Sequence, residues 1–224
     1  VELARVLVEA AGFDVEFVNV PWSRALLYLE EGTIHIMTNL QITLERTEFL
    51  HFIGPAHPQV MALIVKNKNR SFRIENLDDM VSICNRENRA FGYQQDLFYS
   101  TEFNFRIKTD PKFINCFEAI SNTVPNFDKT KNDRILGFFE LAFPLTYTIN
   151  NDSDYMGLAL HKYILSKSSS FFGVSKKGVD IKDVVKLYAA YEKLISNGTL
   201  QRIRNEWGDK VFGEHSPWDN GGEH

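Results

Sequence analysis

The chain has 224 residues, of which 44% are hydrophobic and 24% are charged, a composition typical of an ordered protein with room for two compact lobes. The formal net charge is −4 and the Lys and Arg residues are scattered, which argues against a nucleic-acid partner. The most apolar stretch, residues 135–149, contains Glu140 and Pro144 and is shorter than the roughly 20 apolar residues that span a bilayer.

The first 60 residues alternate between helical and extended patterns. Apolar residues at positions 3, 6, 7 and 10 predict a helix that Gly12 ends. Alternation at positions 13, 15 and 17 predicts a strand, and a stripe at 22, 25, 26 and 29 predicts a second helix closed by Gly32. A strand is expected over 34–40, after which Thr43 is placed to cap a helix over 45–50. This order is typical of α/β proteins, so we expect a mostly parallel sheet covered by helices.

A second α/β unit is predicted beyond an apolar strand at 60–66 and a polar stretch at 67–70. Its strands are expected at 90–94, 105–108 and 135–141, and its helices are expected to begin near Asp96, Cys116 and Pro144. A further strand at 171–176 leads to a helix over 180–196, which Asn197 and Gly198 end. The strands at 60–66 and 171–176 are candidates for two crossings between lobes, with the second lobe inserted in the first.

The two cysteines, Cys84 and Cys116, show neither CxxC spacing nor a Cys/His cluster, which disfavours zinc and thioredoxin-type sites. Two alternatives remain, a disulfide formed in an oxidising compartment or two separate small core residues. The six histidines show no close metal spacing, and no Walker A, dinucleotide or G-x-S-x-G motif occurs. We therefore expect no metal and no cofactor.

Three segments carry a family resemblance. They are PWSRALLYLEEGTIHIMTNLQITLERTEFLHFIGPA at 21–56, FFGVSKKG at 171–178 and YEKLISNGTLQRIRNEW at 191–207. In this order they resemble the first lobe, the return strand and the closing helix pair of family 3 extracellular solute-binding proteins of the amino-acid ABC transporter type, with ITLER in place of I-T-x-x-R. The resemblance implies a type II periplasmic-binding fold, in which two crossing hinge strands join lobe 1 (1–64 plus 175–224) to an inserted lobe 2 (65–174).

The resemblance also implies a function without catalysis. A small polar solute, an amino acid or a related carboxylate, would be held in the interlobe cleft by hinge closure. The implied partners are this ligand and, for import, the membrane subunits of an ABC transporter, and we expect a monomer. The implied location is periplasmic or extracellular, although the printed sequence shows no signal-peptide pattern. Two alternatives stay open: a dehydratase-like enzyme for small carboxylates, with Glu140 or His57 as acid or base, and the sensing module of a signalling receptor.

Arg46 is the first candidate for ligand binding. Its guanidinium stays charged and offers paired donors that match a carboxylate, and a place near a helix start adds backbone N–H groups. The family's I-T-x-x-R pattern implies the same role. The alternative is an exposed helical Arg that pairs weakly with Glu45 or Glu48.

Further candidates follow two strands of the first lobe. Thr38, Asn39 and Gln41 stand where α/β sheets open into ligand crevices, and their alternative role is ordinary loop capping. Trp22 matches an aromatic residue of the family's cleft and could stack on the ligand, or else pack in the core.

The candidates of the second lobe are Glu140, Gln94 and Asp96. Glu140 interrupts an apolar strand, where the family has an acidic residue for the ligand's amino group; its alternative is an ion pair with Arg134 or a lysine. The family's G-S/T-T turn is replaced by residues 95–98, QDLF, which lack the small hydroxyl donors and weaken the match to an α-amino acid ligand.

Overall fold

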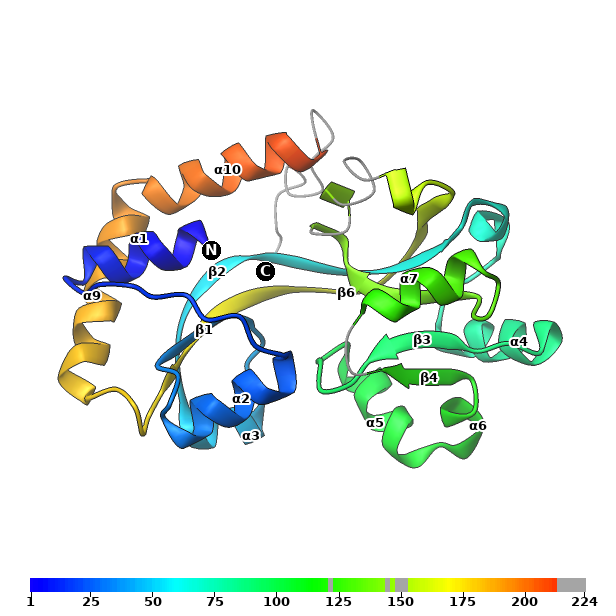
Figure 1. The fold of residues 1–224 in the computed structure, drawn as a ribbon, viewed down its shortest axis with the longest axis horizontal. Helices are drawn as coiled ribbons and strands as arrows, with labels where there is room; N and C mark the ends of the chain where they lie inside the picture. Colours follow the sequence, from blue (N-terminus) through cyan, green and yellow to red (C-terminus); the bar gives the residue numbers. More distant parts are fainter. Residues whose placement is uncertain (121–122, 144–145, 148–152, 213–224) are drawn as a thin grey trace. The chain divides into compact units, whose positions relative to one another are not determined.

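The chain forms two α/β units. The computed structural model describes residues 1–120, 123–143, 146–147 and 153–212. Unit 1 consists of Val1–Pro58 and Ser168–His224, and unit 2 of Gln59–Lys167. Unit 2 is therefore an insertion in unit 1, and the chain passes between the units in two long strands, β2 (Leu50–Lys66) and β6 (Leu158–Ser175) (Figure 1). The division predicted at 64/65 and 174/175 falls within or at the end of the same strands. The helix start expected near Pro144 lies outside the described residues.

The helices of unit 1 pack around the ends of these strands. Apart from its parts of β2 and β6, the unit contains α1 (Glu2–Ala10), α2 (Trp22–Glu31), β1 (Ile36–Leu40), α3 (Leu44–Phe49), α9 (Ile181–Ser196) and α10 (Thr199–Phe212). α1, α9 and α10 lie against one another (Figure 1). Their shared core is formed by apolar side chains of these three helices and of β2 and β6, among them Leu7, Val184, Leu187, Ile53 and Phe172.

The helix ends of unit 1 lie where the sequence predicts them. Gly12 and Gly32 have φ values of +85° and +83°, a left-handed conformation that glycine adopts without steric cost. At α3 the Thr43 hydroxyl accepts a hydrogen bond from the Arg46 N–H. α9 begins directly after Asp180, and Asn197 follows its last residue.

The strand predicted at positions 13, 15 and 17 is wrong, because residues 13–21 form no regular element. Phe13 and Val15 pack against the core of unit 1, whereas Phe17 is exposed beneath the Arg5 guanidinium, 5.1 Å from the ring centre. The alternating apolar pattern here reflects one-sided packing of an extended segment without backbone pairing to a neighbouring strand.

Unit 2 consists of a sheet with helices on both faces. Besides its parts of β2 and β6 it contains η1 (Asn67–Ser71), α4 (Leu77–Glu87), β3 (Phe91–Gln94), α5 (Thr101–Thr109), α6 (Pro111–Ile114), β4 (Phe117–Ile120), α7 (Val124–Lys131), β5 (Gly137–Leu141) and η2 (Ser153–Tyr155). The polar stretch expected to lead between lobes is the short helix η1, inside unit 2.

The sheet is mixed, so the expectation of a mostly parallel sheet is wrong. The strand order is β1-β6-β2-β5-β3-β4, and β1–β6 and β2–β5 are antiparallel pairs. β3 is parallel to both β4 and β5, because α5 with α6, and then α7, carry the chain back across the sheet between these strands. The long strands β2 and β6 do not return through such helices, and the pairs that they form with β5 and β1 are antiparallel.

Two further predicted elements of unit 2 are wrong. Residues 105–108, expected as a strand, lie within α5, which Ser100 caps by accepting the Phe103 N–H. Phe103 is buried and Ile107 partly buried, while Phe105 is 65% exposed, as expected for one face of a helix. Over only four residues this helical spacing looks the same as the alternation of a strand. The helix expected near Cys116 is instead strand β4, and the one expected near Asp96 begins at residue 101.

Alternate residues of the unit 2 strands face two separate cores. Phe91, Phe117 and Phe139 belong to the larger core, beneath α4, α5 and α6. Phe138 faces the opposite way and contacts Phe127 of α7, with the ring centres 4.8 Å apart. Figure 1 shows α7 and α5 on opposite sides of β3.

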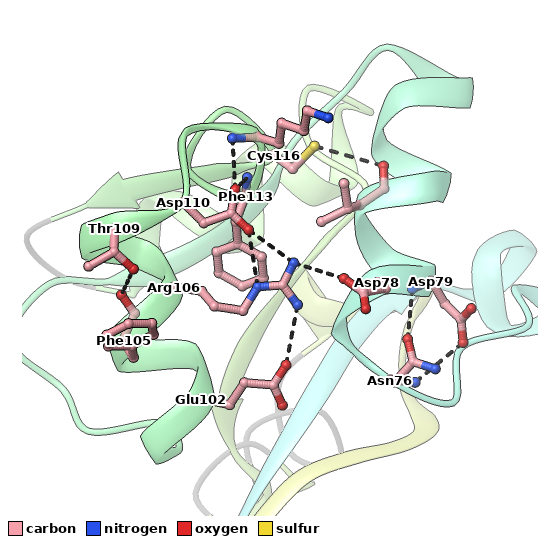
Figure 2. A network of polar contacts seen from close by, with 12 residues as sticks. Asn76, Asp78, Asp79, Glu102, Phe105, Arg106, Thr109, Asp110, Phe113 and Cys116 are labelled. Atoms are coloured by element: carbon pink, nitrogen blue, oxygen red, sulfur yellow. Dashed lines mark hydrogen bonds and ion pairs between the residues drawn. The ribbon is translucent and has the colours of Figure 1, made fainter.

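Two cross-links hold α4 to the segment from α5 to β4. Cys84 and Cys116 form a disulfide with a Cα–Cα distance of 5.7 Å, which decides between the two alternatives for these cysteines. Beside it, Arg106 forms ion pairs with Asp78 of α4 at 2.8 Å and with Glu102 and Asp110 at 3.2 Å each (Figure 2). Among the described residues, no helix has the length and apolarity needed to cross a membrane.

Candidate functional site

Arg46 lies in α3, a few residues after the end of β1, where Thr38, Asn39 and Gln41 lie. The Thr43 cap fixes the start of this helix. The Arg46 residue is only 7% exposed, and its Nη1 donates a hydrogen bond to the Gln41 carbonyl oxygen at 3.1 Å. The alternative of an exposed surface arginine is therefore wrong. A guanidinium kept in a largely buried position is a suitable partner for a carboxylate.

Gln41 and Asn39 make contacts that fix the loop after β1. The Gln41 Nε2 donates to the Ser168 hydroxyl at 2.6 Å, at the start of the chain segment that returns to unit 1. Asn39 is exposed and has a φ of +63°, and its Oδ1 lies 2.6 Å from Nε2 of His57. Thr38 is partly buried within β1. The structure thus brings Gln41 and Arg46 into direct contact and places Asn39 against His57.

His57 favours its neutral form. Burial lowers the pKa of its imidazole, and the nearby Arg204 charge lowers this pKa further, against a raising effect of the Pro58 carbonyl. Nδ1 lies 2.8 Å from that carbonyl and must donate to it. The neutral ring then leaves Nε2 as an acceptor, so its 2.6 Å contact with the Asn39 Oδ1 becomes a hydrogen bond only when the amide oxygen and nitrogen of Asn39 exchange places.

Trp22 is the first residue of α2 and is partly buried. It packs against the small core of Leu29, Leu40 and Leu50. The core-packing role considered for Trp22 is therefore present, and a contact of its ring with ligand remains a prediction.

Glu140 lies on β5, opposite Ala62 of β2. Burial raises the pKa of its carboxyl group, and Oε1 accepts the Leu141 N–H at 2.8 Å. Among the described residues, no Lys or Arg forms an ion pair with Glu140, so the expected alternative of a pair with Arg134 or a lysine has no support there. A partly buried carboxyl group that forms no ion pair with a Lys or Arg of the described residues can receive a ligand's ammonium group.

Gln94 and Asp96 differ in their surroundings. Gln94 ends β3, and its backbone N–H and carbonyl are both bonded to the Tyr99 hydroxyl, at 2.7 and 3.2 Å. Gly92 lies beside Phe138 in the parallel pair β3–β5, so the next residues with the same orientation, Gln94 and Glu140, face the same side of the sheet. Asp96 is exposed, with a φ of +63°, in the turn after β3.

A family model, "Bacterial extracellular solute-binding proteins, family 3", matches residues 1–210. The chain belongs to this family. The resemblance seen in the sequence is thereby confirmed. No curated protein sequence matches the chain.

Solved structures share the fold of this family 3 protein. An amino acid ABC transporter substrate-binding protein from Streptococcus pneumoniae bound to L-arginine is 15% identical with a TM-score of 0.72, over 92% of this chain and 81% of that one. A histidine kinase sensor domain with similarity to periplasmic binding proteins is 16% identical, with a TM-score of 0.75 over 92% and 83%. An ancestral amino-acid-binding protein, a precursor of cyclohexadienyl dehydratase, is 18% identical, with a TM-score of 0.70 over 92% and 82%. These likenesses confirm the predicted type II periplasmic-binding fold.

One polar residue of this family 3 protein escaped the sequence analysis. Asn126, in the first turn of α7, is 1% exposed, and within the described parts of the chain neither its Oδ1 nor its Nδ2 has a hydrogen-bond partner. The sequence Thr-Val-Pro-Asn marks a helix start, because Pro is favoured in the first turn. Nothing in that pattern shows that the amide is buried against a sheet. The described residues contain no group of three or more His, Cys, Asp or Glu side chains placed to hold a metal ion.

Proposed function

We propose that this solute-binding protein captures an amino acid or a related small carboxylate by hinge closure of its two units, and that it serves an ABC importer. The buried Arg46 in the I-T-x-x-R segment carries this proposal. Its guanidinium keeps its charge at every physiological pH and would form two parallel hydrogen bonds with a ligand carboxylate.

Glu140 would receive the cationic end of the ligand. Its burial favours the neutral carboxyl group, and a ligand ammonium would restore the charged form by supplying the missing counter-charge. An ammonium at Glu140 and a carboxylate at Arg46 are the two charged groups of an amino acid.

The other candidates would complete the ligand's surroundings. Trp22 would offer its ring, Thr38, Asn39 and Gln41 would offer donors after β1, and Gln94 and Asp96 would offer polar groups after β3. The hinge would be formed by β2 and β6, with lobe 1 as 1–64 plus 175–224 and lobe 2 as 65–174. The family's extracellular character supports a periplasmic or extracellular location, with the membrane subunits of an importer as partners and a monomeric binding protein.

The shared fold leaves two other functions to be compared with binding. The likeness to a kinase sensor domain makes a sensing module the second candidate, since the same closure could signal to a membrane partner. The enzyme alternative has less support, because His57 and Glu140, its candidate acid and base, belong to different units and have no catalytic partner among the described contacts. We therefore favour binding without turnover.

Isothermal titration with a panel of amino acids and small organic acids tests this proposal. The wild type should bind at least one of them. Arg46→Ala should weaken that binding at least about 30-fold, since it removes the guanidinium and leaves the ligand carboxylate buried without its partner. Arg24→Ala, which removes an exposed arginine of α2 in the same unit, is the matched control and should bind like the wild type. A folded wild type that binds nothing in the panel, or an Arg46→Ala variant with unchanged affinity, would sink the proposal.

A further inference from the structure

The start of α7 holds a buried amide whose hydrogen-bonding capacity is unused. Asn126 is 1% exposed, and among the described residues its Oδ1 and its Nδ2 both lack a partner. Buried amides in folded proteins are nearly always hydrogen-bonded, because their transfer from water is otherwise uncompensated. An amide with both ends unused therefore indicates a group that binds there and is not part of the chain.

The Asn126 amide occupies space that is free only because residue 92 is a glycine without a side chain. A Cβ atom added to Gly92 of β3 would lie 2.4 Å from the Asn126 Oδ1 and 2.9 Å from its Nδ2. The amide thus lies directly on the β3 backbone, in space that any other residue at position 92 would fill.

Glu140 belongs to the same region of unit 2. Gly92 lies beside Phe138, and Glu140 is two residues further along β5 on the same face, a step of roughly 7 Å. The Thr123 hydroxyl, at the start of α7, is near enough to the Glu140 carboxyl group to offset part of the rise in the pKa of that group. The two groups do not form a well-formed hydrogen bond, because their geometry is too poor. The first turn of α7 therefore brings Asn126 one strand step from the proposed ammonium site.

The unused groups define which ligand would match. An amide has one acceptor oxygen and an NH2 donor, so both are satisfied by a group that itself donates and accepts, namely a carboxamide or a hydroxyl. A carboxylate only accepts, an ammonium only donates, and an alkyl group does neither. We propose that Asn126 is a specificity residue that selects ligands with a carboxamide or hydroxyl in the side chain. This inference rests on the proposed function, with the ligand's charged groups at Arg46 and Glu140.

Pairs of amino acids with the same shape test this selectivity. L-asparagine and L-leucine differ by a carboxamide in place of an isopropyl group, and L-threonine and L-valine by a hydroxyl in place of a methyl group. The wild type should prefer the polar member of at least one pair by about tenfold or more, as expected when a buried polar group is left unpaired by the apolar member. Asn126→Leu should reduce that preference to less than about twofold, while its affinity for the apolar member stays within about threefold of the wild-type value.

The control on folding is the thermal transition of Asn126→Leu, which should lie at or above that of the wild type, because an unpaired buried amide is replaced by an alkyl group of similar size. Asn126→Ala is titrated in the same way if the leucine does not fit. A preference for the polar ligands that persists in the folded variant would overturn the assignment alone and would leave the amide to a buried water. If none of the four amino acids binds but another member of the panel does, the assignment of Asn126 alone is overturned; if no member of the panel binds, the amino-acid function falls as well.

Discussion

The protonation state of Glu140 should make the affinity of the protein for its ligand depend on pH. Burial raises its pKa, so it takes up a proton at a higher pH than an ordinary glutamate with a pKa near 4.5. Only the deprotonated form attracts a ligand ammonium. The affinity for an amino acid should therefore rise with pH through the raised pKa of the free protein.

Titrations of the wild type and of Glu140→Gln between pH 4.5 and 7.5 check this prediction. The variant should bind more weakly at pH 7.5, by at least about 30-fold, and should lose the rise of affinity with pH. It should also unfold at a higher temperature in the absence of ligand at pH 7.5, because the folded wild type bears the cost of a buried charge there. Arg46→Ala serves as the comparison, since a guanidinium does not titrate in this range and its removal should leave the slope with pH in place. Equal slopes in the wild type and Glu140→Gln would contradict the assignment of Glu140.

At the level of single residues, the sequence predicts which polar side chains are candidates for a site but not how buried they are. The segment ITLER predicts a helix start with Arg46 in its first turn, and the structure has both. That the guanidinium is buried depends on the packing of residues far away along the chain. Asn126 shows the same limit more strongly, because its burial depends on Gly92, a residue 34 positions earlier on a different element. Local pattern holds no information on such a pair.

Among the elements, the disulfide is the connection whose removal has the most predictable effect. Cys84 and Cys116 are 32 residues apart, and a cross-link of that span restricts the unfolded chain by about 3–4 kcal/mol at 25 °C. Reduction should lower the free energy of unfolding by about this amount. The fold should persist in the reduced protein, because the buried side chains of Met80, Phe103 and Phe113 also join α4 to α5 and α6 in one apolar core.

Urea denaturation with and without dithiothreitol measures this effect. The double variant Cys84→Ser/Cys116→Ser is the matched control, since its midpoint should equal that of the reduced wild type and should not respond to dithiothreitol. A wild-type midpoint that is unchanged after complete reduction would show that the disulfide contributes nothing to stability.

Elements with both a periodic stripe and end signals were predictable from the sequence, and short ones were not. α1, α2 and α9 each combine an apolar stripe with a glycine, asparagine or aspartate at an end. At 105–108 only four residues were available, over which helical and strand periods look alike, and at 13–17 a genuine alternation occurs without a pairing strand. The first two thirds of β6 were missed because the serines at 166 and 168–170 resemble a loop.

For the whole molecule, hinge closure predicts a change in size on ligand binding. A ligand held by both units favours the closed form by its differential affinity, so the radius of gyration should fall when the protein is saturated. Small-angle X-ray scattering measures this directly. Arg46→Ala in the presence of the same ligand concentration should retain the ligand-free value. A saturated wild type with an unchanged radius of gyration would contradict closure, although binding itself would stand.

The order of the family's segments, more than any periodicity, allowed the architecture to be predicted. Matches at 21–56 and 191–207 belong to one lobe, and their separation along the chain requires an insertion between them. The sense of strand pairing was missed, because periodicity in one strand carries no information on the direction of its neighbour.

The insertion also sets an order of events during synthesis. The apolar side chains of Leu7, Val8 and Ile53 have their partners in Val184 and Leu187, which the ribosome adds more than a hundred residues later. At roughly 5–20 residues per second this delay is on the order of 10 s, during which the whole of Gln59–Lys167 emerges. The inserted unit can therefore complete its core first, while the amino-terminal segment waits with its hydrophobic surface uncovered and available to a chaperone.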